Sequence, residues 1–208
     1  MARRPPTFVD QVVIAYRATS YDVPVWVSPN RRHGRWNIAN QEPIAQYMSL
    51  DAEAPFAEML RHENLRSESD ASHYKTTIWQ LQVDSGAIVD YSTFELAEAA
   101  GFDPEALVSD DYERCQAEAR WLVSHNARGV LTPSAALPGS TSLTLFGPRV
   151  RVRWGTSVKL ASSVPAQPIS TGAPPTGLTD RVRYYGQREP RLEEYLRESS
   201  WREAGGRD

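Results

Sequence analysis

Three segments of the sequence carry residues that could bind a phosphorylated ligand or act on it. The first is the run RRHGRWN at residues 31–37. Its glycine would let the backbone approach a ligand closely, Arg35 offers a planar fork of donors that suits phosphate, and Trp36 offers a face for stacking. The run also fits a surface loop whose tryptophan is buried in the core. The residues alone slightly favour that second interpretation.

The second segment presents an acidic side chain, Glu58, on a helix that we expect from Pro55 to about Asn64, since proline favours a first helical turn. The apolar residues of this helix share one face: Phe56, Met59 and Leu60. Glu58 lies roughly opposite that face, so it need not point into the core. Such a carboxylate usually pairs with a neighbour, here Arg61 or His62, and by itself it does not indicate catalysis.

The third segment is GVLTPSA at residues 129–135, which predicts a strand running into a Pro-Ser turn. A hydroxyl at the end of a strand, such as that of Ser134, could bind a ligand. A serine in this position is more often a residue that forms the turn.

The sequence lacks the motifs of several large enzyme classes. Its four histidines, at positions 33, 62, 73 and 125, have no metal-ligand spacing, and we expect no metal site. HExxH, GxSxG, GxGxxG and GxxxxGK[ST] do not occur, which argues against metalloproteases, serine hydrolases, Rossmann enzymes and P-loop NTPases. Candidate site residues must therefore be sought on strand ends and loops.

Apolar periodicity and turn residues predict the elements that position these groups. We expect strands at 11–18, 43–50, 76–83, 129–132, 142–146 and 150–160. We expect helices at 55–64, from a capping box at 92–95 to Gly101, and at 110–126. The irregular stretch at 19–40 is long for a compact domain, and its arginines and tryptophans favour a functional loop.

The chain of 208 residues is long enough for one sizeable core, and we expect one domain at residues 1–161. Residues 162–180 are mostly Ser, Pro, Thr, Gly and Ala, and we interpret them as a linker. Residues 181–208 are interpreted as a charged helical tail, with an amphipathic helix at 190–203. This tail could dock on its own domain, on a partner or on nothing.

Charge and composition restrict the partners and the compartment. The net charge is -3, and acidic residues dominate positions 51–126, so a broad basic face for nucleic acid is not expected. Long apolar runs are absent, which argues against a membrane span. A single cysteine, Cys115, excludes an intrachain disulfide, and we expect a cytoplasmic protein.

Taken in order, the segments resemble the RES domain, a family named for its Arg, Glu and Ser. The resemblance spans roughly residues 12–160. It is carried by the following blocks: Tyr16-Arg17, Gly34-Arg-Trp-Asn37, Ile44 to Leu50 with Tyr47, Ala57-Glu58, Asp111 to Gln116, Gly129 to Ser134, and a strand ending in Phe146. Two departures are Met48-Ser49, where the family often has Leu-Ala, and the lack of a basic residue in 135–139.

The resemblance implies an α+β fold similar to ADP-ribosyltransferases, with two small packed sheets and helices around an NAD-binding cleft. It implies a bacterial toxin that degrades NAD, with NAD as substrate, no cofactor, inorganic phosphate as a candidate co-substrate, and a cognate antitoxin protein as partner.

The resemblance also assigns roles to residues. Glu58, Arg17 and Ser134 are the expected catalytic residues. The expected ligand-binding residues are Arg35, Trp36, Asn37, Tyr47 and Tyr16.

Two other functions remain open on the sequence. The same fold could transfer ADP-ribose to a macromolecule, or it could bind a nucleotide or protein partner without turnover. Cleavage of NAD to phosphorolysis or hydrolysis products is the leading hypothesis.

Overall fold

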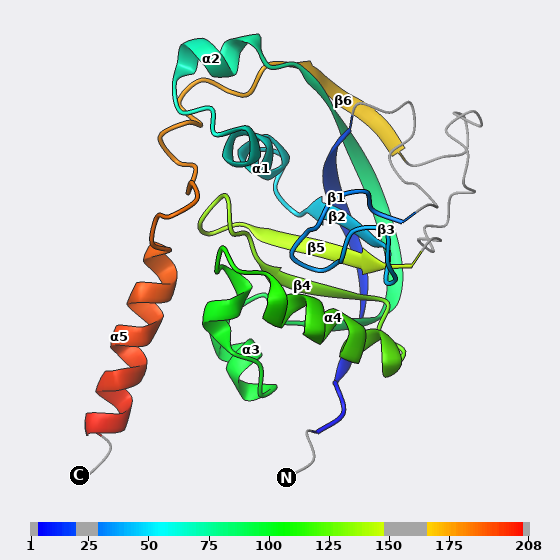
Figure 1. Ribbon diagram of the computed structural model, residues 1–208, viewed down its shortest axis with the longest axis vertical. Coiled ribbons are helices and arrows are strands. Elements are labelled where there is room, and N and C mark those ends of the chain that lie inside the picture. The colour runs from blue at the N-terminus through cyan, green and yellow to red at the C-terminus, as the bar shows by residue number, and fades with distance from the viewer. Residues whose placement is uncertain (1–3, 20–28, 148–165, 206–208) are drawn as a thin grey trace.

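The computed structural model describes residues 4–19, 29–147 and 166–205. In chain order the elements are β1 (Phe8–Thr19), β2 (Ala45–Ser49), α1 (Ala54–Glu63), α2 (Glu68–His73), β3 (Thr76–Asp90), α3 (Phe94–Ala99), the 3₁₀ helix η1 (Pro104–Leu107), α4 (Glu113–Ser124), β4 (Gly129–Pro133), β5 (Thr141–Phe146), β6 (Ala166–Gly172) and α5 (Pro190–Gly205) (Figure 1). The expected α+β class is confirmed. The strand expected at 150–160 and part of the loop expected at 19–40 lie outside the described residues.

The strands of the described residues form one sheet of six, in the order β1-β2-β5-β4-β3-β6, and β1 also pairs with β3. Because β1 pairs with both β2 and β3, five of the strands close into a ring. The expectation of two separate packed sheets is therefore wrong. The long strand β3 connects the strands into one sheet. One of its edges pairs with β1, and its other edge pairs with β6 at the start of β3 and with β4 at its end.

Strand β3 continues well past its expected end at residue 83. Its pairing with β1 shifts register between Val9 and Gln11, opposite the stretch of β3 that holds Gly86 and Ala87. Ala87 has φ of 56°, and the extra residue on β3 forms a bulge. The strand was expected to end at residue 83, before the polar run Asp84-Ser85-Gly86. The bulge lets β3 continue to pair with β1 beyond this run.

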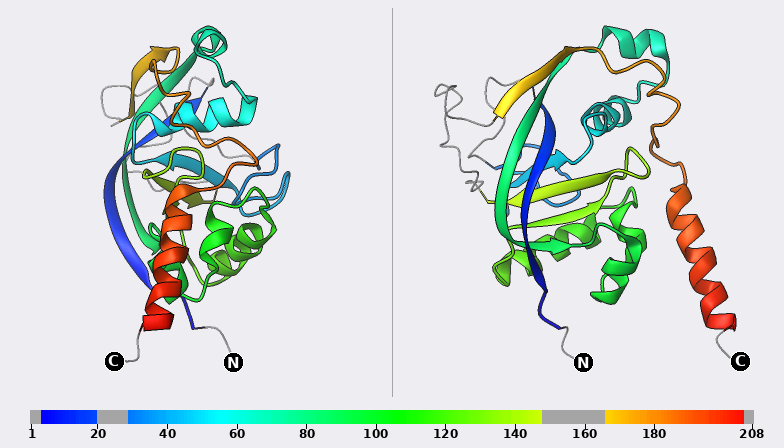
Figure 2. Two further views of the ribbon diagram at one scale, coloured as in Figure 1. Left: turned by 90° about the vertical axis from the view of Figure 1, so that its left-hand side faces the viewer. Right: turned by 180° about the vertical axis from the view of Figure 1, so that it is seen from behind.

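Helices cover the sheet and divide the core. Figure 2 shows β1 and β3 as a curved wall with α1, α3 and α4 on the other side of the molecule. Residues inside the ring make one cluster: Ala15, Met48, Leu81, Leu131, Leu143 and Leu145. Helix α1 covers a second cluster, and α3, η1, α4 and α5 cover a third.

The C-terminal region is part of the folded unit. Of the linker expected at 162–180, residues 162–165 lie outside the described residues, and the rest does not behave as an independent linker. Strand β6 pairs antiparallel with β3 from Thr76 to Leu81. Beyond it, Leu178, Val182 and Tyr184 are buried in the cluster under α1. The ladder of an existing strand supplies backbone partners to β6, which the composition of the segment does not reveal.

Helix α5 starts at Pro190, as the sequence predicts, and its N-terminal half packs on α3. The Tyr195 hydroxyl donates a 2.6 Å hydrogen bond to Glu98, and the Tyr195 ring lies 5.6 Å from that of Phe94. Leu192 is buried in the same cluster, whereas Trp201 is exposed. The tail therefore docks on its own domain.

Candidate functional site

The loop before β2 is held rigid around the hydroxyl of Tyr47. Gly34 and Asn37 form a β-bridge, the backbone N–H of Trp36 donates to Tyr47 Oη at 2.9 Å, and Tyr47 donates to Asn37 Oδ1 at 2.8 Å. A Cβ at position 34 would lie 2.5 Å from Tyr47 Oη, so only glycine fits here. Burial raises the pKa of the Tyr47 phenol well above its usual value, and the hydrogen bond from the Trp36 N–H opposes this shift.

Trp36 is a core residue and does not offer a stacking face to a ligand. Its side chain is 1% exposed and packs beside Phe102 and Phe146. The core interpretation of this tryptophan is the one that the structure supports. Asn37 is also buried, and its amide donates to the Arg32 carbonyl at 2.9 Å. Both residues shape the loop that carries Arg35.

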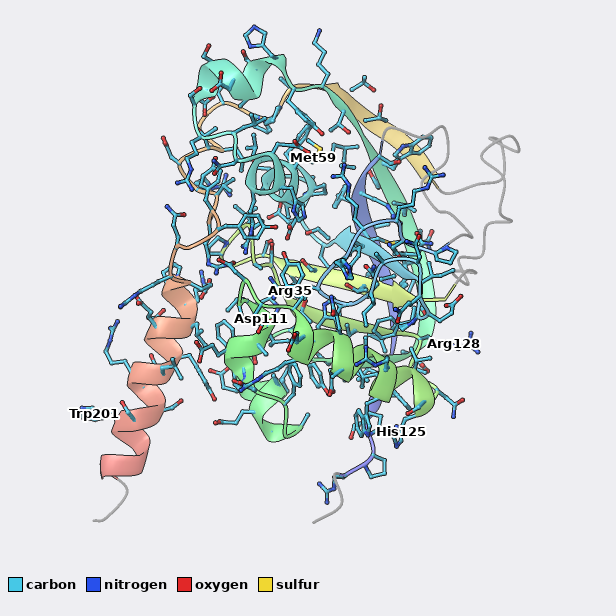
Figure 3. The ribbon with its side chains drawn as sticks, in the orientation of Figure 1. Arg35, Met59, Asp111, His125, Arg128 and Trp201 are labelled. Atoms are coloured by element: carbon cyan, nitrogen blue, oxygen red, sulfur yellow. The ribbon has the colours of Figure 1, made fainter. Side chains whose placement is uncertain are left out.

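Arg35 points from this loop toward the start of α4. Its Nη1 donates to the carbonyl of Ser109 at 2.7 Å and to that of Ala106 at 3.2 Å. The guanidinium carbon lies 4.8 Å from the centre of the Tyr112 ring. Figure 3 shows Arg35 beside Asp111, below helix α1. The arginine is therefore fixed between the Gly34 loop and the residues that precede α4.

Arg17 is buried near the end of β1 and donates from Nη1 to Gln46 Oε1 on β2 at 2.6 Å. Burial lowers the pKa of Arg17 to about 9, and the nearby Tyr47 opposes this shift, so the guanidinium remains charged at neutral pH. Side chains alternate along a strand, so Arg17 faces the same side as Ala15, inside the ring. Tyr16 faces the opposite side and packs against the cluster under α1.

Glu58 is on the solvent side of α1, as its helical position predicts. Its side chain is 39% exposed, and Oε2 lies 3.9 Å from Nε2 of His62, one turn along the helix. Buried residues of α1 fall on the other face, including Phe56 and Leu60. The carboxylate is therefore partly exposed to solvent, with His62 as its neighbour on the same helix.

Ser134 forms a turn between β4 and β5. Its hydroxyl oxygen accepts from the backbone N–H groups of Ala136 at 3.3 Å and Leu137 at 3.1 Å. The side chain is 1% exposed. The turn-forming interpretation of this serine is the one that fits the observed hydrogen bonds, and the turn it shapes presents the carbonyl of Ala135 to two arginines.

Those two arginines, Arg61 and Arg183, were not predicted as part of any site. Both donate to the carbonyl of Ala135 and to Oδ1 of Asp110, the latter at 2.5 Å from Arg61 and 3.3 Å from Arg183. The other carboxylate oxygen accepts from the Gly186 N–H at 2.7 Å. Arg61 is one of the buried residues of α1, and an arginine on the apolar face of a helix is a sequence signal that could have identified it. Arg183 lies in the segment interpreted as a tail, where no sequence signal marked it.

A continuous series of contacts joins Glu58 to Arg35. From His62, Nδ1 lies 2.8 Å from Tyr185 Oη, which lies 3.1 Å from Tyr112 Oη, and Tyr112 packs under Arg35. Glu58 and Arg35 are thus not in contact with each other but are linked through three intervening aromatic side chains. Arg17 interacts electrostatically with Tyr47. Tyr47 in turn interacts electrostatically with Arg35.

Two features are absent from the described residues. No helix among them is long and apolar enough to span a membrane. No group of three or more His, Cys, Asp or Glu side chains among them could hold a metal ion.

Comparison with known families identifies the domain. The model of the RES domain matches residues 14–162, which include Arg17, Arg35, Tyr47, Glu58 and Ser134. The chain belongs to the RES family. The segment that carries Arg183 and Tyr185 lies beyond the RES match.

The fold of this RES protein is similar to that of the MbcT toxin in the crystal structure of the M. tuberculosis MbcT-MbcA toxin-antitoxin complex. The TM-score is 0.58 at 23% sequence identity, and the match covers 85% of this chain and 91% of that one. The likeness therefore extends past the RES match into the C-terminal region. No curated protein matches the sequence.

Proposed function

We propose that this RES protein cleaves the bond between nicotinamide and ribose in NAD, and that it acts as the toxin of a toxin–antitoxin pair. The observation that carries the proposal is the RES match, which includes a solvent-facing Glu58 and Arg35; Tyr185, from beyond the match, completes the series of contacts between them. The fold shared with MbcT supports the toxin part of the proposal.

The chemistry explains why a carboxylate is the central group. Breaking the bond gives a ribosyl oxocarbenium ion, and nicotinamide departs as a neutral ring with the electron pair of the bond, so no strong acid is needed. A carboxylate beside the forming cation stabilises it. Glu58 would contribute on the order of 3 kcal/mol, by analogy with preorganised oxyanion-hole donors of opposite charge.

The arginines would hold the phosphate groups. A guanidinium fork matches phosphate oxygens, and Arg35 is held in place by two backbone carbonyls. Arg17 stays protonated in its buried position because its pKa is about 9. Tyr47, whose hydroxyl is occupied within the loop, would present its ring to nicotinamide. Ser134 would act through the turn it forms.

The acceptor is either water or inorganic phosphate. Water gives ADP-ribose and a proton, and phosphate gives an ADP-ribose phosphate ester, each with release of one nicotinamide. The alternative of ADP-ribose transfer to a macromolecule keeps the same bond cleavage and changes only the acceptor.

The experiment is an NAD consumption assay with the purified full-length chain, with and without phosphate, in which products are separated and identified by mass. We expect nicotinamide release that Glu58→Gln slows by roughly 100-fold or more. Glu63→Gln on the exposed face of the same helix is the matched control and should behave as the wild type. Intact NAD under all conditions would refute the proposal. Label from NAD appearing on lysate macromolecules would indicate transfer.

The toxin part has its own test in cells. Expression of the wild type should arrest growth and deplete NAD, while Glu58→Gln should do neither at equal protein level. A cognate antitoxin, if encoded beside this gene, should bind the purified protein and restore growth. Growth arrest by both forms alike would argue against toxicity through NAD cleavage.

A further inference from the structure

The segment that follows β6 inserts a tyrosine beside the proposed catalytic carboxylate. Tyr185 lies beyond residues 14–162, the RES match, yet its Oη is 2.8 Å from Nδ1 of His62. The other ring nitrogen of His62 faces Glu58 at 3.9 Å. A residue from outside the recognised domain is thus one contact removed from Glu58.

Tyr185 is held in this position by a buried clamp. Arg183 and Gly186, on either side of it, both donate to Asp110, which also binds Arg61. The guanidinium carbon of Arg61 lies 4.4 Å from the centre of the Tyr185 ring. Arg61 is 1% exposed and Arg183 is 7% exposed, whereas the Asp110 side chain between them is 33% exposed, so the two guanidinium groups are shielded from water and the carboxylate is partly exposed. The tyrosine is therefore presented by a fixed loop.

The Glu58 carboxylate favours one direction of hydrogen bonding. A carboxylate only accepts, so the imidazole nitrogen that faces it, Nε2 of His62, is the one suited to carry the N–H. The Nδ1 atom of the neutral imidazole then accepts from Tyr185 Oη at 2.8 Å. Tyr185 Oη lies 3.1 Å from Tyr112 Oη, from which its oxygen can accept in turn.

We propose that Tyr185 is a positioning residue of the site, which fixes the Nε2–H tautomer of His62 and so directs an N–H group at the Glu58 carboxylate. This inference rests on the proposed function of Glu58. The charged and titratable groups around His62 are Glu58 and Arg61 on α1, Tyr185 on the C-terminal loop and Tyr112 behind it. Asp110 is already paired with two arginines.

This arrangement would matter most when substrate covers the site. Glu58 and His62 are partly exposed, at 39% and 56%, so water weakens their interaction in the free protein. A bound dinucleotide would exclude that water and strengthen a correctly oriented N–H···carboxylate contact. Tyr185 would then hold one Glu58 oxygen toward His62 and leave the other for the ribose.

The test compares wild type with Tyr185→Phe, which removes the hydroxyl and keeps the ring over Arg61. Tyr184→Phe is the matched control, because its hydroxyl donates to the carbonyl of Leu65, away from Glu58. In ¹⁵N NMR spectra we expect His62 as the Nε2–H tautomer in wild type and in the control, and as a mixture in Tyr185→Phe. His33, His73 and His125 serve as internal references.

In the NAD assay, we expect Tyr185→Phe to lower kcat by roughly fivefold, the effect of one hydrogen bond, with little change in KM. A His62 tautomer unchanged by Tyr185→Phe would overturn the inference, and so would a changed tautomer with unchanged kcat. Failure of wild type to consume NAD would refute the proposed function and would be seen separately, because the NMR readout needs no turnover.

Discussion

Arg61 donates a 2.5 Å hydrogen bond to Asp110 from a position that is almost completely buried. Asp110 also forms an ion pair with Arg183, so one carboxylate is paired with two guanidinium groups. Removing it would leave both arginines without a carboxylate partner. We expect Asp110→Asn to lower the free energy of unfolding by about 1–3 kcal/mol, less than the loss of a fully buried ion pair because the Asp110 side chain is 33% exposed. Chemical denaturation measures this directly.

Asp111→Asn is the matched control for that variant. It makes the same chemical change at the next residue, where the side chain accepts from the Glu113 N–H at 3.0 Å just before α4. The Oδ1 atom of asparagine can accept the same hydrogen bond, so this variant should change stability by less than about 0.5 kcal/mol. Equal effects at the two positions would show that Asp110 is not the centre of the clamp.

Gly34 offers a test of the loop that carries Arg35. In Gly34→Ala the new Cβ would meet Tyr47 Oη at 2.5 Å and Asn37 Oδ1 at 2.6 Å, so both side chains must move. We expect a loss of about 1–3 kcal/mol in unfolding free energy, typical of overpacking, and a raised KM for NAD as Arg35 shifts. Denaturation and steady-state kinetics measure the two effects.

The control is Gly172→Ala, where a Cβ would meet nothing within 4 Å. This variant should retain wild-type stability and kinetics within error. A stable Gly34→Ala protein with unchanged KM would show that the loop tolerates the added methyl group and that Arg35 does not depend on it.

Local patterns in the sequence were enough to predict most elements, because their signals lie within a few residues. Pro55 marks the start of α1, and its helical period places Glu58 away from the core. The capping signal at 92–95 predicts α3, although the cap is Thr93 rather than Ser92. The short helix α2 was missed, although Ser67 and Asp70 give a capping signal for it.

Long-range relationships could not be predicted in this way. The bulge that extends β3 becomes visible only once β1 is aligned beside it. Tyr185 meets His62 across 123 residues of sequence, and no periodicity links them. Trp36 shows the opposite case: the residues alone already favoured a place in the core, and only the resemblance assigned it to ligand binding.

The buried thiol of Cys115 gives a prediction about pH. Burial raises the pKa of the Cys115 thiol to about 11, from about 9 for a thiol in water, and its Sγ donates to the Ala106 carbonyl. The folded state therefore holds the proton more tightly than the unfolded state. This contribution to stability is complete below pH 9 and falls as the pH rises from 9 to 11, by about 1.4 kcal/mol per unit.

Two measurements check the Cys115 prediction. The thiol should react with an aromatic disulfide reagent at pH 8.5 only when denaturant unfolds the protein, since the native thiolate is scarce and shielded. The Cys115→Ala variant should lose less stability than wild type between pH 9 and pH 11. Rapid labelling of the native protein at pH 8.5 would contradict the burial on which both expectations depend.

Docking of α5 is tested by two identical substitutions one helical turn apart. Leu192 is 8% exposed and belongs to the cluster under α3 and α4, whereas Leu196 is 49% exposed. Leu192→Ala should lower the unfolding free energy by about 2–4 kcal/mol, since it leaves a cavity in the core, while Leu196→Ala should cost less than about 1 kcal/mol. Both leucines have the same helix propensity, so the difference between the variants isolates tertiary packing from helix formation. If the two variants unfold at the same denaturant concentration, α5 does not pack on the RES domain in solution. A large difference would make residues 190–205 part of one cooperative unit with the segment that presents Tyr185.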